Sequence, residues 1–128
     1  MRHLKDRYLK FTNSSRNTVL CELSFNADNI WTRFKGLLGT KTLPPGQGLY
    51  LNECNGIHMF WMAYAIDAVF LDPDLQVVGL VENIKPWAVS KVFKGARSCL
   101  ELPVGTIAAT ATAVGDKVLI EKAAPPPH

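Results

Sequence analysis

Residues 66 to 81 restrict the fold more than any other part of this sequence. "IDAVFL" and "QVVGLV" are apolar runs rich in β-branched and aromatic residues, and "DPDL" separates them. Proline fixes φ near the value that a turn needs, and aspartate bonds readily to the backbone of its own turn. Runs of this length on either side of a turn are typical of paired strands. We therefore predict a β-hairpin over residues 66 to 81, in the hydrophobic core.

Further short strands are expected along the chain, at 18–25, 49–51, 98–103 and 117–122. One amphipathic helix is predicted near residues 29–38, because apolar residues recur there at spacings of three and four and Gly39 follows. Strands about 10 to 15 residues apart with one early helix predict a mainly β fold, an antiparallel sandwich or barrel. In "LELP", Glu101 alternates with leucines, so we expect its side chain to face outward or to form a salt bridge.

The domain organisation expected from 128 residues is a single folded unit. Residues 1–17 are polar and charged and predict a flexible arm. Residues 18–122 carry all the expected strands and form the domain. Residues 123–128, "AAPPPH", predict a flexible tail.

Composition and charge exclude several classes of protein. The net charge is only +3 and the basic residues are scattered, which argues against nucleic-acid binding. Three cysteines without a CxxC pair predict reduced thiols rather than a disulfide framework or a zinc ribbon. The apolar run 59–66 is far shorter than the roughly twenty residues that cross a bilayer, and the first residues lack the apolar segment of a secretory signal. We expect a soluble, cytoplasmic protein.

Seven motifs in order resemble the domain-of-unknown-function 192 family, also called uncharacterised protein family 0127. They are "RFKGLLG", "LPPGQGLYL", "IHMFWMAYAIDAVFLD", "VV", "PW", "LELPVGT" and "GDKV", spread over residues 33 to 120. The resemblance implies a compact, mostly β domain with a short helix, found mainly in prokaryotes, and it implies no reaction. Where many family members carry basic residues or a proline, this chain has Thr40, Ala63, Ala65 and Ala88. An anionic ligand is therefore less expected here.

His58 and Asp67 stand out because they lie within an otherwise apolar stretch, "HMFWMAYAIDAVFLD". A buried carboxylate is costly unless it is hydrogen-bonded or paired. The structural interpretation is that Asp67 holds a bend, with the amides of "AYA", Arg97 or His58 as partners. The functional interpretation is that Asp67 is a polar anchor in a pocket. Cys54 and His58 lie four residues apart, but two local ligands are too few for zinc, so we expect no metal and no cofactor.

Aromatic residues suggest where a ligand would bind. If a cleft exists, Trp61 and Trp87, together with His58, Asp67 and Arg97, would suit a small neutral polar ligand such as a sugar.

The function expected from the sequence is therefore a non-catalytic module that binds a small polar molecule or a protein partner, as a monomer or weak homo-oligomer. One alternative is a hydrolase or metal-dependent enzyme that uses His58, Asp67 and Cys54. A purely structural role is the third.

Overall fold

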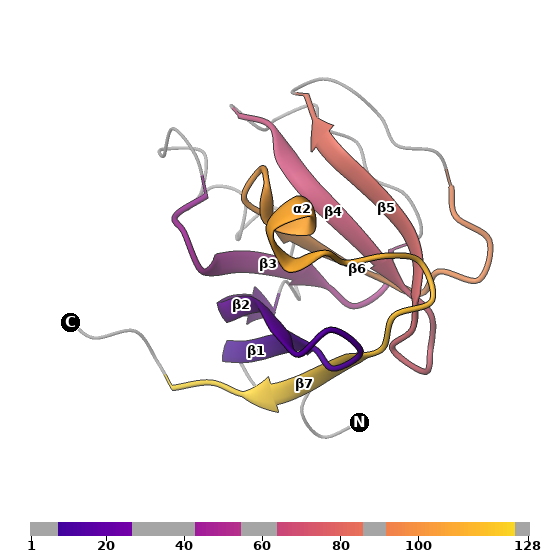
Figure 1. Cartoon of the computed structure of the whole chain (residues 1–128), viewed down its shortest axis with the longest axis horizontal. Helices are drawn as coiled ribbons and strands as arrows, with labels where there is room; N and C mark the ends of the chain where they lie inside the picture. Colours follow the sequence, from indigo (N-terminus) through magenta and orange to yellow (C-terminus); the bar gives the residue numbers. More distant parts are fainter. Residues whose placement is uncertain (1–7, 27–42, 55–63, 86–91, 125–128) are drawn as a thin grey trace.

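The computed structural model describes residues 8–26, 43–54, 64–85 and 92–124 of the chain (Figure 1). Seven strands form one sheet in this part of the chain: β1 (Tyr8–Asn13), β2 (Thr18–Asn26), β3 (Gln47–Leu51), β4 (Ile66–Leu71), β5 (Val77–Ile84), β6 (Ser98–Leu102) and β7 (Val118–Lys122). Their order across the sheet is β5-β4-β6-β3-β2-β1-β7.

The sheet curls into a half-barrel, so that its two outermost strands approach each other at one end (Figure 1). An isolated bridge joins Gln76 to Lys117. Beside it, the Val118 amide donates to the Leu75 carbonyl at 2.9 Å, and the Val77 amide donates to the Asp116 carbonyl at 2.8 Å. The expected β-rich, barrel-like fold is thereby confirmed. Among the described residues, no helix is both long enough and apolar enough to span a bilayer.

The predicted hairpin is present as β4 and β5, which pair in antiparallel register with Val69 opposite Leu80. Asp72, rather than Asp74, organises the turn. Its Oδ1 accepts hydrogen bonds from the amides of Asp74 and Gln76, both at 2.9 Å. The hairpin forms because both strands are apolar and the turn residues provide hydrogen bonds to the backbone amides of the turn.

One strand pair differs from the antiparallel expectation, since β2 and β3 run parallel. Parallel neighbours need a long connection, and residues 27 to 46 supply it. The helix expected near residues 29–38 falls on this connection and lies outside the described residues.

The expectation of a flexible arm over residues 1–17 is wrong from Tyr8 onward. Tyr8–Asn13 form β1, which lies between β2 and β7. Leu9 and Phe11 are fully buried, whereas Lys10 between them is half-buried. Period-two alternation was present in "YLKFTN", but the neighbouring charges obscured it. At the other end of the chain, the Ala123 amide extends the pairing by donating to the Tyr8 carbonyl at 3.0 Å.

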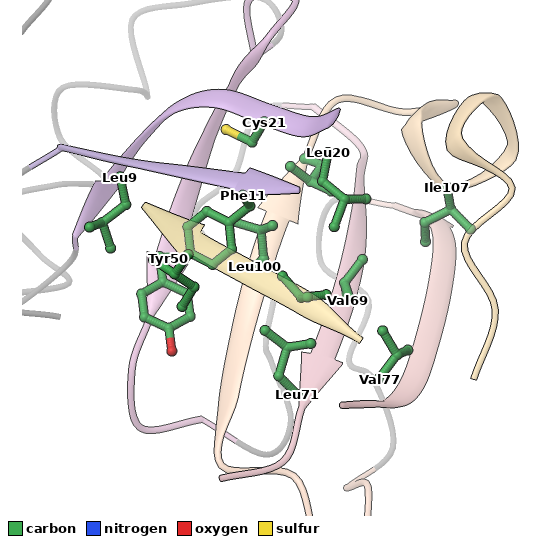
Figure 2. Close-up of a cluster of buried hydrophobic side chains, with 13 residues drawn as sticks. Leu9, Phe11, Leu20, Cys21, Tyr50, Val69, Leu71, Val77, Leu100 and Ile107 are labelled. Atoms are coloured by element: carbon green, nitrogen blue, oxygen red, sulfur yellow. The ribbon is translucent and has the colours of Figure 1, made fainter. Parts of the chain in front are cut away.

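Two hydrophobic clusters lie on opposite faces of the sheet. The inner cluster contains residues of both edge regions, such as Val77 and Ile120, and therefore lies inside the curl (Figure 2). It comprises Leu9, Phe11, Leu20, Cys21, Tyr50, Val69, Leu71, Val77, Leu100, Leu102, Ile107, Val118 and Ile120. The outer cluster comprises Leu43, Leu49, Leu51, Tyr64, Ile66, Ala68, Phe70, Ile84 and Cys99. Because β4 is covered on both faces, all of its residues are buried.

A short helix that the sequence did not predict, α2 (Thr106–Thr110), lies against the curled sheet (Figure 1). Its Ile107 side chain joins the inner cluster. The Thr18 hydroxyl at the start of β2 donates to the Thr110 carbonyl at 3.0 Å, which fastens the end of α2 to the sheet. Five residues are too few for a helical repeat to be visible in a sequence.

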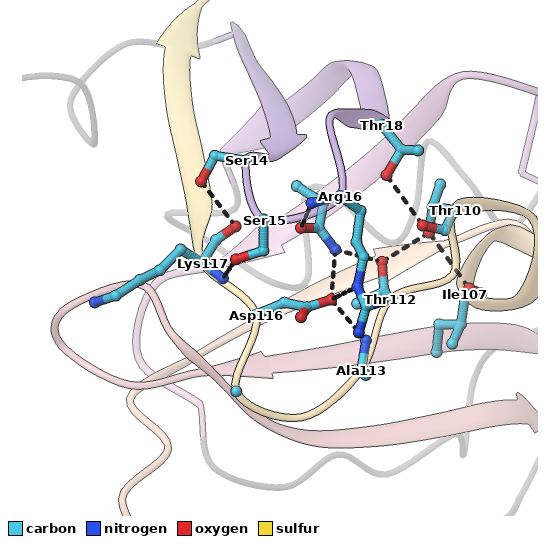
Figure 3. Close-up of polar contacts among 12 residues, drawn as sticks. Ser14, Ser15, Arg16, Thr18, Ile107, Thr110, Thr112, Ala113, Asp116 and Lys117 are labelled. Carbon is cyan, nitrogen blue, oxygen red and sulfur yellow. Dashed lines mark hydrogen bonds and ion pairs between the residues drawn. The ribbon is translucent and has the colours of Figure 1, made fainter.

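A buried polar network follows α2 and connects it to β1 (Figure 3). The Asn13 amide group donates to Thr112 Oγ1 at 3.0 Å and to Asp116 Oδ2 at 2.9 Å. The same carboxylate oxygen accepts from Arg16 Nε at 3.0 Å and from the Ala113 amide at 2.9 Å. Hydrogen bonds from Asn13 and Arg16 lower the pKa of Asp116 to about 2, so it is ionised at neutral pH. The network thus holds the loop before β7 against β1.

Phe70→Ala should destabilise the protein by about 3 to 5 kcal/mol, the usual cost of emptying a phenylalanine site in a core. Phe70 is fully buried, and its ring packs on Phe93 with centroids 4.6 Å apart. Gly79 lies opposite Phe70 in the ladder. Its lack of a side chain leaves room for the Phe93 ring, which a Cβ at Gly79 would overlap. Urea denaturation measures the change. Val114→Ala, at a position that is 64% exposed, is the matched control and should cost less than about 0.5 kcal/mol. Equal losses in the two variants would contradict this packing.

Candidate ligand-binding hollow beside Arg97

Asp67 is fully buried at the start of β4, and its carboxylate bonds to backbone amides from two other segments. Oδ1 accepts from the Asn83 amide at 2.9 Å. Oδ2 accepts from the amides of Gly105 at 3.1 Å and Ile107 at 3.0 Å, at the start of α2. The expected burial is present, but these partners are not the amides of "AYA", Arg97 or His58. A carboxylate that already accepts three amide hydrogen bonds is fixed by structure, with little left for a ligand.

Arg97 lies far along the ladder from Asp67. Asp67 pairs with Leu102 at one end of the β4–β6 ladder, whereas Leu71 pairs with Ser98 at the other. The Arg97 amide donates to the Leu71 carbonyl at 2.8 Å. The two residues expected to share a pocket are therefore at opposite ends of β4. The other expected members, His58, Trp61 and Trp87, lie outside the described residues.

The backbone of Arg97 is held on both sides, while its side chain is exposed. Besides its own amide bond to Leu71, its carbonyl accepts from the Cys54 amide at 2.7 Å. Just before it, the Ala96 amide donates to the Phe93 carbonyl at 3.0 Å, closing a turn in which Gly95 has a φ of 85°. This turn sets the direction in which the chain enters β6. The fixed backbone sets the point on the surface from which the exposed Arg97 side chain extends.

Two hollows meet at Arg97. The larger has a volume of about 370 Å³ and is lined, among the described residues, by Glu53, Cys54, Ala96 and Arg97. The smaller has a volume of about 110 Å³ and is lined by Tyr50, Asn52, Asp72, Pro73, Leu75, Arg97 and Ser98. Arg97 belongs to both linings. The described structure thus provides one shared cation between two adjoining concave surfaces.

The lining offers both hydrogen-bond donors and acceptors. Glu53 and Asp72 supply carboxylates, Asn52 supplies an amide, and Arg97 supplies guanidinium donors. Burial raises the pKa of Tyr50, although its hydrogen bond with Ser98 and the charge of Arg97 act in the opposite direction. The phenol therefore stays neutral at physiological pH and can both donate and accept. Such a mixed lining suits a ligand that is polar without a large net charge.

Glu101, a residue expected to face outward, is instead buried inside the fold behind this hollow. Its Oε1 has no hydrogen-bond partner among the described residues. Burial, with a smaller contribution from Cys54, raises the pKa of Glu101 to about 8. The outward expectation is wrong because β6 lies between β4 and β3 in a sheet whose two faces are both covered. Alternation with leucine marks a solvent face only where one side of a sheet is open.

Metal chemistry has no evident support in this region. In residues 8–26, 43–54, 64–85 and 92–124, no three His, Cys, Asp or Glu side chains are grouped so that they could hold an ion.

The model of a known family, DUF192, described as "Uncharacterized ACR", matches residues 10–120. A UPF0127 protein of Thermococcus sibiricus is 34% identical over 96 residues, which cover 72% of this chain and 62% of that protein. The aligned region thus spans less than two thirds of that relative's own length.

Two solved structures share the fold. One, a protein of unknown function from Novosphingobium aromaticivorans, superposes with a TM-score of 0.68 at 20% identity, covering 88% of this chain and 83% of the other. The second, from Sinorhizobium meliloti, is described as a candidate transcription regulator. It gives a TM-score of 0.67 at 19% identity, covering 88% and 91%. At this identity the similarity concerns the fold alone. All three organisms are prokaryotes, as the resemblance implied.

Removing the Asp67 carboxylate should weaken the fold in a graded way. Asp67→Ala leaves three backbone amides without an acceptor and should cost about 3 to 5 kcal/mol. Asp67→Asn keeps one acceptor oxygen and should fall between wild type and Ala. Urea denaturation gives the order, with the exposed Asp74→Ala as a control that should stay near wild type. If Asp67 serves a ligand instead, its removal should leave stability unchanged or raise it, and an Ala variant as stable as wild type would overturn the structural role.

Glu101→Gln should make the protein more stable at pH 8 and leave it nearly unchanged at pH 4. Between its ordinary pKa of 4.5 and its folded pKa of about 8, Glu101 is ionised in the unfolded chain but protonated in the fold. Stability therefore falls as pH rises through this window, and the uncharged glutamine removes that loss of about 4 to 5 kcal/mol. Denaturant titrations at several pH values measure the effect. Glu82→Gln, at an exposed position, keeps Glu101 and should follow the wild-type pH profile. If the free energy of unfolding of Glu101→Gln differed from that of wild type by the same amount at every pH, the prediction would be refuted.

Proposed function

We propose that this chain, which belongs to the DUF192 family, is a non-catalytic module that binds a small, neutral, polar molecule in the hollows beside Arg97. The single observation that carries the proposal is the position of Arg97, an exposed cation with a fixed backbone that lines both hollows. A guanidinium that lines both hollows can donate hydrogen bonds to a ligand in either of them.

The charges of the lining favour a neutral ligand over an anion. Glu53 lies in the larger hollow and Asp72 in the smaller, so each hollow pairs the guanidinium with a carboxylate. An anion attracted by Arg97 would be repelled by these groups. Basic residues common in the family are also replaced here by Ala63, Ala88 and Thr40. A polyhydroxylated molecule such as a monosaccharide can donate to the carboxylates and accept from the guanidinium.

The enzymatic alternative receives less support. In that alternative, Asp67 would orient His58 and Cys54 would be the nucleophile. Both oxygens of Asp67 already accept backbone amides, one from β5 and two from the start of α2. An orienting carboxylate must also accept from the imidazole, and three of the roughly four acceptor positions of Asp67 are already used.

Titration of isotope-labelled protein with glucose and with N-acetylglucosamine, followed by two-dimensional NMR, tests the proposal. We expect shifts at the amides of Asn52, Cys54 and Ser98, with a Kd of about 1 mM, equivalent to about 4 kcal/mol. Arg97→Met should weaken binding about tenfold, because it removes the guanidinium hydrogen bonds and keeps a similar side-chain length.

Lys94→Met is the matched control, since Lys94 is exposed on the same turn and lines neither hollow. It should bind the sugars as wild type does. Sulfate serves as the anionic probe. Binding of sulfate in place of the sugars, or equal sugar binding by Arg97→Met and wild type, would overturn the proposal.

A further inference from the structure

Cys54 and Cys99 are neighbouring thiols. Cys21, Cys54 and Cys99 are all thiols rather than disulfides in the structure. Cys99 lies in the outer cluster, and Cys54 packs against that cluster. The Cys54 side chain lies close enough to Cys99 to raise the pKa of its thiol. Cys21 is separate, because it belongs to the inner cluster on the opposite face of the sheet.

The backbone around the two thiols suits a disulfide. Leu51 at the end of β3 is paired with Cys99 of β6, and the Cys54 amide bonds to the Arg97 carbonyl, two residues before Cys99. The two cysteines therefore belong to adjacent segments of the same antiparallel pairing. Cys99 lies directly opposite Leu51, so Cys54 is offset from it along the pairing. A disulfide needs Cα atoms about 4.4 to 6.8 Å apart, and closing the bond therefore requires residues 52 to 54 to adjust toward Cys99.

The two thiols differ in their access to solvent. Cys54 is half-buried and lines the hollow of about 370 Å³, which is large enough to admit a small molecule. Cys99 is fully buried. Burial raises the pKa of Cys99 well above its ordinary value, helped by Cys54 and Glu101. Cys54 is thus the thiol that a reagent would meet first, and Cys99 is protected until its neighbour has reacted.

We propose that Cys54 and Cys99 form an oxidisable dithiol that reduces a small hydroperoxide entering the hollow. The Cys54 sulfur attacks the peroxide, forming an S–O bond and breaking the O–O bond, so that an alcohol or water leaves and Cys54 becomes a sulfenic acid. The Cys99 sulfur then attacks the Cys54 sulfur, forming the S–S bond and releasing water. In total, two thiols and one hydroperoxide give one disulfide, one alcohol or water, and one water. The proton of the Cys99 thiol leaves with the sulfenic hydroxyl as that water, so the step needs no further base.

This proposal is independent of the ligand proposed above, because it needs the two thiols and not the Arg97 guanidinium. The experiment is to treat the full chain with hydrogen peroxide and count free thiols. We expect the count to fall from three to one. The intact mass should decrease by about 2 Da, the two hydrogens lost in a disulfide, and peptide mapping should join Cys54 to Cys99.

Three variants assign the roles. Cys21→Ser should form the same disulfide at the wild-type rate. Cys54→Ser should keep both remaining thiols reduced, with at least a tenfold slower reaction. Cys99→Ser should stop at a sulfenic acid on Cys54, which dimedone traps.

The wild-type peptide map decides the proposal even if Cys99→Ser fails to fold. Three thiols retained after peroxide treatment, a disulfide that includes Cys21, or oxidation of Cys54 to sulfinic acid without a cross-link would each overturn it.

Discussion

The Asp67 carboxylate is the constraint on which the arrangement of the inner face depends. It is fully buried and accepts amide hydrogen bonds from β5 and from the start of α2. A buried carboxylate without partners would cost several kcal/mol, so these segments must stay where their amides can reach it. Asn83 adopts a φ of 53° beside a register shift in β5, which is unusual for a residue other than glycine. The carboxylate thus holds a strained strand and a five-residue helix that could not persist alone.

The two ends of the half-barrel therefore serve different purposes. At the end near Asp67, α2 covers the inner cluster with Ile107. The Asn13–Asp116 network fixes the chain that follows α2, next to Val77 at the start of β5. At the other end of the β4–β6 ladder, the chain turns at Gly95 and exposes Arg97 beside the two hollows. Arg97 and Glu53 are exposed there, and the candidate binding site is built around them.

Glu101 is a buried carboxyl group next to the two thiols. Because Glu101 lies on the central strand β6, its side chain is buried on the outer face of the sheet, close to Cys99, and its Oε1 has no hydrogen bond among the described residues. Folding therefore favours the protonated carboxyl, and each shift of one pKa unit corresponds to about 1.4 kcal/mol. A group that costs stability at neutral pH and lies beside two thiols is arranged as functional groups often are.

The sequence by itself determined the elements whose signal is local. The β4–β5 hairpin, the strands at β2, β3, β6 and β7, and the burial of Asp67 all follow from apolar runs, turn residues and one polar residue among them. Only the tertiary structure decided that Tyr8–Asn13 pair as β1, that β2 and β3 are parallel, and that Asp67 bonds to Gly105 and Ile107. It also decided that Glu101 is buried and that Cys54 meets Cys99. These features depend on which strands become neighbours, and that choice is made by packing between distant segments rather than by the pattern within any one of them.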